Sequence, residues 1–172
     1  SITFFCIHGN HEKRPQSIKS YKEKIYKDGI VYYEEKYPNL LFAKDGEIYN
    51  FKEIRRELEE KGYKFKSECD TEVLLHAYAE YGIDAVARFN GMFAFAIIEK
   101  DTGRITLCRD RIGVKPLYYY YDGSTLIWGS ELKPLMAHPE FKKEIRTELI
   151  SRYLCYKYIN SPDTIFKNTY KS

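Results

Sequence analysis

The spacing of apolar side chains predicts helices in the middle and near the end of the chain. Residues 51–61 are strongly charged, yet apolar side chains recur there every three or four positions, as on one face of a helix. Residues 70–81 show the same periodicity, and Asp70 is placed to cap that helix at its N-terminus. Shorter helical patterns occupy 131–137 and 147–158. A glycine or a proline lies close after each segment, which supports these boundaries.

Apolar runs rich in β-branched and aromatic residues predict strands in the rest of the chain. The run 92–98 is apolar throughout, as in strands that are buried on both faces. The four runs between 92 and 129 follow one another through short connections, the last of them Asp-Gly-Ser, and predict an antiparallel meander. The predicted strands are 2–7, 30–33, 40–43, 92–98, 104–109, 116–121 and 125–129.

Two further signals complete the predicted secondary structure. Residues 12–28 are charged and carry three large apolar side chains at helical spacing, which predicts another helix. Lys-Asp-Gly at 44–46 predicts a turn. Helices beside a mainly antiparallel sheet give the α+β class, and a strand as apolar as 92–98 needs cover on both faces. We therefore expect a layered arrangement of antiparallel sheets flanked by helices.

Composition limits the kind of protein without identifying it. Apolar residues make up 44% of the 172 positions, enough for a core, and no run is long enough to cross a membrane. No signal peptide is recognisable at the start, so we expect a soluble, cytoplasmic protein without a membrane partner. The net charge of +3 is too small to predict a nucleic-acid partner. Four scattered cysteines without zinc spacing favour free thiols, at Cys6, Cys69, Cys108 and Cys155.

Five short strings in a fixed order carry the most specific signal. They are Gly-Glu-Ile-Tyr-Asn (46–50), Cys-Asp-Thr-Glu-Val-Leu-Leu (69–75), Phe-Asn-Gly-Met-Phe-Ala-Phe-Ala (89–96), Arg-Asp-Arg-Ile-Gly-Val-Lys-Pro-Leu-Tyr-Tyr (109–119) and Ser-Glu-Leu-Lys-Pro-Leu (130–135). Together they closely resemble the class-II glutamine amidotransferase domain of asparagine synthetases, over about residues 46–139. A weaker resemblance continues to about residue 170, where the chain is similar to the start of the ATP-dependent synthetase domain.

The resemblance implies a fold, a reaction and partners. Family members adopt the N-terminal-nucleophile hydrolase fold, with two antiparallel sheets between helical layers, which we expect to be incomplete here at the N-terminus. They hydrolyse glutamine to glutamate and ammonia. A cysteine at the start of the mature chain attacks the amide, and an Asn-Gly pair forms the oxyanion hole. The implied partners are a synthetase domain or a second copy of the chain. ATP and Mg²⁺ would belong to the synthetase domain, so no cofactor is expected within this chain.

The match to the family's substrate site is partial. Gly46 fits the oxyanion-hole glycine, but Asp45 stands where the family has asparagine. An amide donates a hydrogen bond to the developing negative charge, whereas a carboxylate repels it. Glu47 fits the glutamate that holds the substrate, and Asp70 fits the aspartate that binds its amino group. Simpler roles stay open for Asp45, as a turn residue, and for Asp70, as a helix cap.

The nucleophile is the larger gap in the match. Residue 1 is serine, so Cys6 could act only if five residues were removed from the chain. The alternative is a buried, inert thiol within the first predicted strand. The sequence therefore predicts an amidotransferase domain of the asparagine-synthetase type whose hydrolytic activity is impaired or lost.

The first segment of the chain has a second resemblance. Gly-Asn-His-Glu after an apolar run is similar to the metal-binding loop of binuclear metallophosphoesterases, which implies Asn10 as a metal ligand and His11 near the phosphoryl group. Four histidines without a Gly-His-x-His motif are too few for a two-metal centre. The resulting prediction is a chimera of three parts: a phosphoesterase-like segment (1–44), an amidotransferase core (45–139), and a linker with the start of a synthetase domain (140–172).

Three functional hypotheses follow from these observations. The first is a glutamine amidotransferase domain, active or not, and turnover of glutamine would test it. The second is a metal-dependent phosphoesterase fragment, for which hydrolysis of a phosphodiester would depend on added manganese. The third is a non-catalytic binding domain, which would bind glutamine tightly without turning it over.

Overall fold

The computed structural model describes residues 3–7, 21–26, 29–34 and 40–172. Side chains are described from Lys44 onward. The chain forms two compact units. The first unit comprises residues 1–11, 24–31 and 116–172, and the second comprises residues 12–23 and 32–115.

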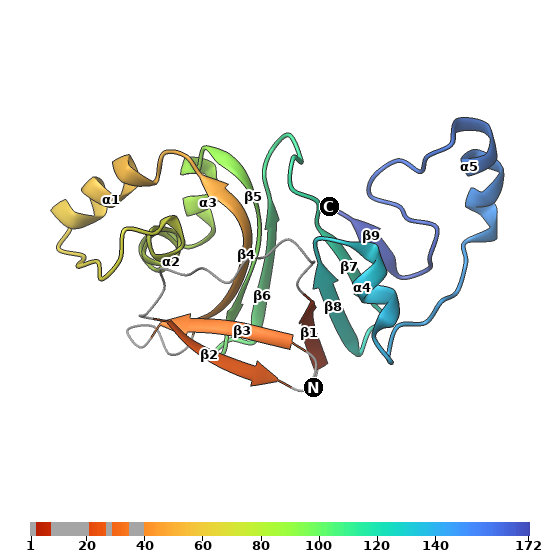
Figure 1. The fold of residues 1–172 in the computed structure, drawn as a ribbon, viewed down its shortest axis with the longest axis horizontal. Coiled ribbons are helices and arrows are strands. Elements are labelled where there is room, and N and C mark those ends of the chain that lie inside the picture. Colours follow the sequence, from red (N-terminus) through yellow and green to blue (C-terminus); the bar gives the residue numbers. More distant parts are fainter. Residues whose placement is uncertain (1–2, 8–20, 27–28, 35–39) are drawn as a thin grey trace. The chain divides into compact units, whose positions relative to one another are not determined.

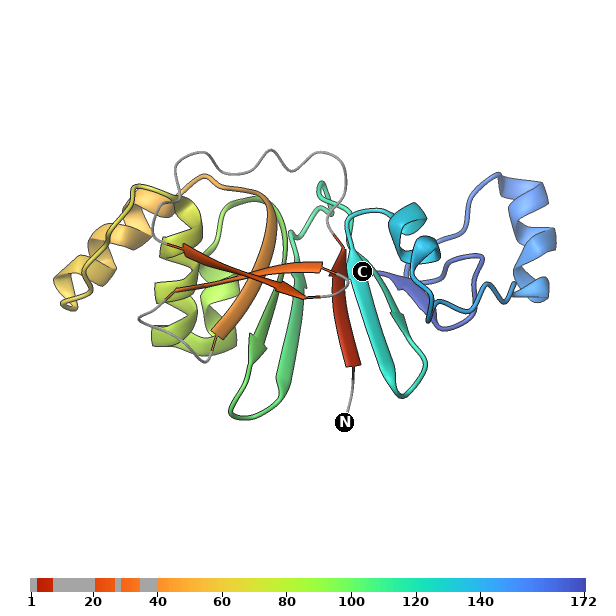
Figure 2. The same ribbon diagram turned by 60° about the horizontal axis from the view of Figure 1, so that its bottom comes forward.

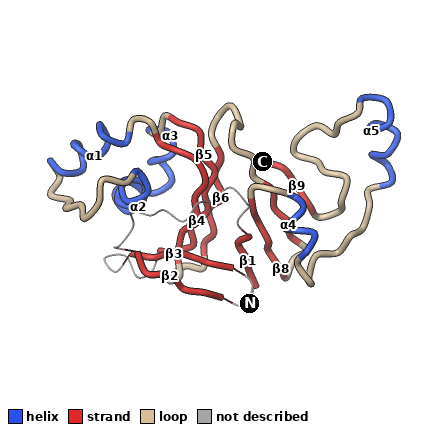
Figure 3. Tube along the Cα trace, in the orientation of Figure 1, coloured by secondary structure: helices blue, strands red, loops and turns tan. Residues whose placement is uncertain are grey.

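The second unit contains most of a five-stranded sheet with the strand order β2-β3-β4-β5-β6 (Figures 1 and 3). Strand β4 pairs antiparallel with β3 and with β5, and β5 pairs antiparallel with β6. The longest pairing joins β4 to β5, from Leu40 opposite Glu99 to Ile48 opposite Gly91. The strands are β2 (Tyr21–Tyr26), β3 (Gly29–Glu34), β4 (Leu40–Ile48), β5 (Gly91–Glu99) and β6 (Arg104–Arg109).

Three helices pack on one face of this sheet (Figures 1 and 2). They are α1 (Phe51–Glu60), α2 (Asp70–Tyr81) and α3 (Ala85–Arg88), with the 3-10 turn η1 (Gly82–Asp84) between the last two. Helix α2 contacts both α1 and β4, so most of its side chains are buried. They form one apolar core with α1 and β5, whose largest members include Leu58, Leu74, Leu75, Phe89 and Ile97.

The first unit is built on a four-stranded sheet with the order β1-β8-β7-β9. Strand β1 runs parallel to β8, and the other pairs are antiparallel. Helix α4 contacts β7 and β8, where Leu135, Tyr120, Ile127 and Phe141 share a core. The elements are β1 (Thr3–Ile7), β7 (Tyr118–Tyr121), β8 (Thr125–Gly129), α4 (Leu132–Ala137), the 3-10 turn η2 (Thr147–Leu149), α5 (Ile150–Tyr156) and β9 (Thr169–Lys171).

The structure confirms the α+β class and most of the predicted elements. The helix predicted at 70–81 and the strands predicted at 104–109 and 125–129 have the bounds observed for α2, β6 and β8. Within the described residues, no helix is both long and apolar enough to cross a bilayer.

The predicted meander is wrong. Strands β5 and β6 belong to the five-stranded sheet, whereas β7 and β8 belong to the four-stranded sheet. The two hairpins exist, but β6 does not pair with β7, and residues 110–117 between these strands form a turn. Its backbone amides at Val114 and Lys115 donate to the carboxylate of Asp110.

Two other local predictions are also wrong. The predicted helix at 12–28 contains strand β2 at Tyr21–Tyr26, because helical spacing of a few large side chains does not exclude a strand in so short a segment. The predicted turn at 44–46 lies inside β4, which continues to Ile48. Gly46 has a positive φ of 95°, so the turn-like sequence bends the strand without ending it.

Candidate functional site

The residues that the sequence assigns to glutamine lie together where β4 ends and α2 begins. We call this group the β4–α2 site. It comprises the predicted residues Asp45, Gly46, Glu47 and Asp70, together with two lysines that contact them, Lys44 and Lys115; all six lie in the second unit.

Asp70 ties the start of α2 to the end of β4. Its Oδ2 accepts a hydrogen bond from the backbone amide of Ile48 at 2.8 Å and another from Nζ of Lys44 at 2.8 Å. The predicted role of Asp70 as the helix cap is wrong, because Asp70 is the first helical residue and its carboxylate points toward β4. Cys69 is the N-cap, and its sulfur accepts from the amide of Thr71 at 3.3 Å.

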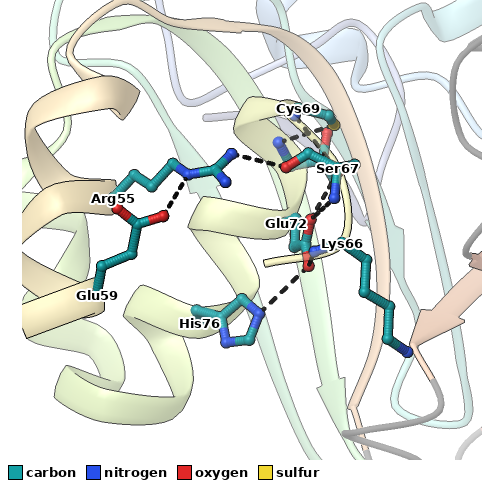
Figure 4. A network of polar contacts seen from close by, with 8 residues as sticks. Arg55, Glu59, Lys66, Ser67, Cys69, Glu72 and His76 are labelled. Carbon is teal, nitrogen blue, oxygen red and sulfur yellow. Dashed lines mark hydrogen bonds and ion pairs between the residues drawn. The ribbon is translucent and has the colours of Figure 1, made fainter. Parts of the chain in front are cut away.

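A buried carboxylate fixes the loop that leads into α2 (Figure 4). Glu72 is 1% exposed, and its Oε2 accepts from the amide and the hydroxyl of Ser67 at 2.8 Å and 2.6 Å. Its other oxygen accepts from the amide of Lys66 at 2.8 Å. Arg55 on α1 donates to the carbonyl of Ser67 at 2.7 Å. The residues before Asp70 are therefore held from both helices.

The electrostatics of Glu72 favour its ionised form. Burial alone would raise the pKa of this carboxyl group, but the hydrogen bonds from Ser67 and the amide of Lys66 outweigh burial and leave the pKa below its ordinary value. The imidazole of His76 lies 3.6 Å away on the next turn of α2 (Figure 4). The same ring contacts the rings of Tyr63 and Phe65. This cluster holds the loop that precedes Asp70.

Gly46 is required by the close approach of β4 and β5. A Cβ added at this position would lie 2.0 Å from the carbonyl oxygen of Met92. The reciprocal position, Gly91, has the same constraint, because a Cβ there would lie 2.1 Å from the carbonyl oxygen of Glu47. Contacts this short force the backbone to move, so only glycine fits at either position.

The carboxylate of Asp45 faces a lysine. Oδ1 of Asp45 lies 3.1 Å from Nζ of Lys115, and both side chains are partly exposed. The positive charge offsets the carboxylate at the position where the family resemblance expects an oxyanion-stabilising amide.

A rigid turn after β6 places Lys115 beside Asp45. Burial acts to raise the pKa of Asp110, but amide donors that include Lys115 and Val114 prevail and hold the pKa below its ordinary value. The guanidinium of Arg109 donates to the carbonyls of Lys115, at 2.6 Å, and of Gly113. Gly113 has a φ of 72°, and a Cβ there would meet the Arg109 guanidinium at 2.6 Å. The string Arg-Asp-Arg-Ile-Gly-Val-Lys thus encodes one turn.

The remaining predicted site residues are placed as follows. Glu47 is exposed at the end of β4, next to Gly46. Cys6 lies within β1, opposite Trp128 of β8, so the strand predicted around it is confirmed, and its role as a nucleophile stays a prediction. Asn10 and His11 lie outside the described residues, so the phosphoesterase resemblance stays a prediction. Within the described part of the chain, no cluster of three or more histidine, cysteine, aspartate or glutamate side chains could hold a metal.

Sequence reasoning missed the two lysines of the site. Lys115 lies inside the string 109–119 that carries the family resemblance, and its place directly after the turn that Gly113 permits could have singled it out. Lys44 follows the apolar residues of β4 directly, so a strand extended by a few residues would have turned its side chain toward the core.

Comparisons with known proteins all point to the same family. The glutamine amidotransferase domain family matches residues 31–171. A putative glutamine-hydrolyzing asparagine synthetase 2 of Methanocaldococcus jannaschii is 40% identical over 151 residues, which cover 86% of this chain and 29% of that protein. The glutamine-hydrolyzing asparagine synthetase 3 of Bacillus subtilis is 40% identical over 124 residues, covering 72% of this chain and 20% of that protein. The chain therefore spans less than a third of the length of these relatives.

A solved structure has the same kind of fold. The glutamine phosphoribosylpyrophosphate amidotransferase of B. subtilis matches with a TM-score of 0.50 and 25% identity, over 56% of this chain and 22% of that chain. The region that matches the family begins at residue 31, inside the segment that resembles metallophosphoesterases, and continues almost to the last residue. The sequence match and the fold thus agree, and the chain belongs to the glutamine amidotransferase domain family.

Proposed function

We propose that this chain is the glutamine-binding domain of an asparagine-synthetase-like protein, and that Gly46 and Glu47 contact the ligand. One observation carries the proposal: the hydrogen bond from the amide of Ile48 to Asp70 joins the end of β4 to the start of α2. The residues that the family resemblance assigns to glutamine come from these two elements, and this bond gathers them in one place.

The reaction proposed for the site is hydrolysis of the glutamine side-chain amide. Water adds across the carbon–nitrogen bond, and the products are glutamate and ammonium. Asp45 weakens this reaction, because its carboxylate repels the negative charge that develops on the amide oxygen, and Lys115 offsets that repulsion only in part. Slow hydrolysis is therefore the expected behaviour of the natural sequence.

The ammonium would be used by a synthetase domain. The matched relatives are several times longer than this chain and are named for glutamine-dependent asparagine synthesis. A synthetase domain, with its ATP and Mg²⁺, is the proposed partner, and a second copy of the chain is a further one.

Binding of L-glutamine, measured by calorimetry, tests the ligand assignment. We expect Glu47→Gln to weaken binding at least tenfold, because the substitution removes the carboxylate that faces the ligand. Glu60→Gln, which changes an exposed glutamate at the end of α1, is the matched control and should bind as the natural chain does. Equal affinities in all three proteins would refute the assignment of Glu47.

Release of glutamate from L-glutamine tests the reaction. Any hydrolysis that belongs to this site should be lost in Cys6→Ala if Cys6 is the nucleophile. Hydrolysis that persists unchanged in Cys6→Ala would exclude Cys6 and require another nucleophile.

A further inference from the structure

Lys44 is a charged residue in an unusual place. It lies in β4, opposite Phe95 of β5, and its side chain is only 8% exposed. A buried ammonium group is costly unless hydrogen-bond acceptors surround it. The structure provides two of them within the β4–α2 site.

Both acceptors of Lys44 belong to residues that the family resemblance assigns to glutamine. The ammonium Nζ donates to the carbonyl oxygen of Gly46 at 2.7 Å and to Oδ2 of Asp70 at 2.8 Å. Oδ2 of Asp70 also accepts from the amide of Ile48 at 2.8 Å. The side chain of Asp70 is 17% exposed, so little of its carboxylate faces solvent. This oxygen of the carboxylate thus already has two donors, one of them a full positive charge.

The chemistry of the two ammonium groups is the same. The α-ammonium of a free amino acid and the ammonium of lysine each carry one positive charge and three N–H donors. Two such groups against one carboxylate repel each other, and one carboxylate charge balances only one of them. A ligand that brings its own ammonium must therefore displace Lys44 or do without Asp70.

We propose that the Lys44 ammonium occupies the place of the ligand's α-ammonium, and so makes Lys44 the residue that sets ligand selectivity at this site. The favoured ligand class is a primary carboxamide without an α-ammonium group. This inference rests on the proposed glutamine site and changes the role of Asp70, which binds Lys44 instead of the ligand.

Two ligands that differ only at the α-carbon test the proposal. L-glutamine carries the α-ammonium, and glutaramate carries hydrogen in its place. Their affinities for the full chain are measured by calorimetry and expressed as a ratio within each protein, so that differences in folding between variants cancel. We expect the natural chain to bind glutaramate at least as tightly as glutamine, and Lys44→Met to shift the affinity ratio toward glutamine at least tenfold, because Asp70 becomes free for the ligand. Lys64→Met, at an exposed lysine of the same unit, should leave the ratio unchanged.

A second variant keeps the test decisive if Lys44→Met does not fold. Asp70→Asn in the natural background should leave the ratio unchanged, since the ligand does not use that carboxylate. Two results would overturn the inference while leaving glutamine binding intact. One is a fall of tenfold or more in the ratio of glutamine to glutaramate affinity in Asp70→Asn. The other is an unchanged ratio in folded Lys44→Met. If neither ligand binds to the natural chain or to Lys44→Met, the proposed glutamine site itself is overturned, and this inference with it.

Discussion

The hydroxyl of Ser67 donates a hydrogen bond to Oε2 of Glu72 across 2.6 Å. The contact closes the loop before α2 onto the first turn of the helix, where Glu72 is buried. Because the same carboxylate also accepts from two backbone amides, the loop depends on the negative charge of Glu72.

Replacing Glu72 by glutamine should destabilise the fold in a pH-dependent way. The side-chain amide has one acceptor where the carboxylate has two, so at least one backbone donor loses its partner, at a cost of about 1–3 kcal/mol. The pKa of Glu72 is lowered in the folded state, so its charge stabilises the fold above the ordinary glutamate pKa. That contribution is lost as the pH falls through the folded-state value.

Chemical denaturation at several pH values measures this effect. The difference in unfolding free energy between the natural chain and Glu72→Gln should be largest near neutral pH and shrink below about pH 4.3, the ordinary pKa of a glutamate. Glu68→Gln, at an exposed position of the same loop, is the control and should show no such trend. A constant difference across this range would contradict the argument.

Gly46→Ala should be far more damaging than alanine at another glycine with positive φ. At Gly46 the new methyl group would meet the carbonyl oxygen of Met92 at 2.0 Å, whereas nothing lies within 4 Å of a Cβ at Gly62. The φ values are similar, 95° and 90°, so the backbone strain is comparable. We expect about 1 kcal/mol of destabilisation for Gly62→Ala and at least about 3 kcal/mol for Gly46→Ala. Thermal unfolding of both variants measures the difference, and equal losses would show that the β4–β5 approach is unimportant.

Asp45→Asn should speed up glutamine hydrolysis. The amide of asparagine donates to the oxyanion that the carboxylate of Asp45 repels, and one such donor is worth about 10²–10³ in rate. Since Lys115 already offsets part of the repulsion, a gain of at least about tenfold is expected. Glutamate release from L-glutamine measures the rate. Asp84→Asn, at an exposed aspartate of η1, is the control. A rate that falls or stays equal in Asp45→Asn would argue against position 45 as part of the oxyanion site.

Cys108 should be almost unreactive toward alkylating reagents at neutral pH. Burial raises the pKa of its thiol to about 11, so roughly 0.1% of it is thiolate at pH 8. Cys155 is exposed on α5 and should be modified by iodoacetamide well before Cys108. The labelling rate of Cys108 should rise about tenfold for each pH unit up to its pKa. Mass spectrometry of timed samples identifies the modified residue, with urea-unfolded protein as the control. Equal labelling of Cys108 and Cys155 in the folded chain would contradict the assigned burial.

Local patterns were sufficient to predict the elements around the site. The helix at 70–81 was predicted with its observed bounds, because an apolar stripe and a following glycine mark it in the sequence. The family resemblance also selected Gly46, Glu47 and Asp70, which lie at the adjoining ends of β4 and α2.

Long-range pairing could not be predicted in the same way. Alternating residues show that a segment is a strand but not which strand lies beside it, so β6 and β7 were wrongly joined. Lys44 stands beside Asp45 and Gly46 in a typical turn sequence. Only the pairing of β4 with β5 reveals that its side chain is buried and reaches Asp70.

The reciprocal glycines of β4 and β5 have a consequence for sequence change in this chain. The atom that excludes a side chain at Gly46 is the carbonyl oxygen of Met92, and at Gly91 it is the carbonyl oxygen of Glu47. Every amino acid carries that oxygen, so no second-site substitution on the facing strand can create room for a methyl group. A screen for suppressors of Gly46→Ala should therefore return true revertants and none that act by shortening a neighbouring side chain.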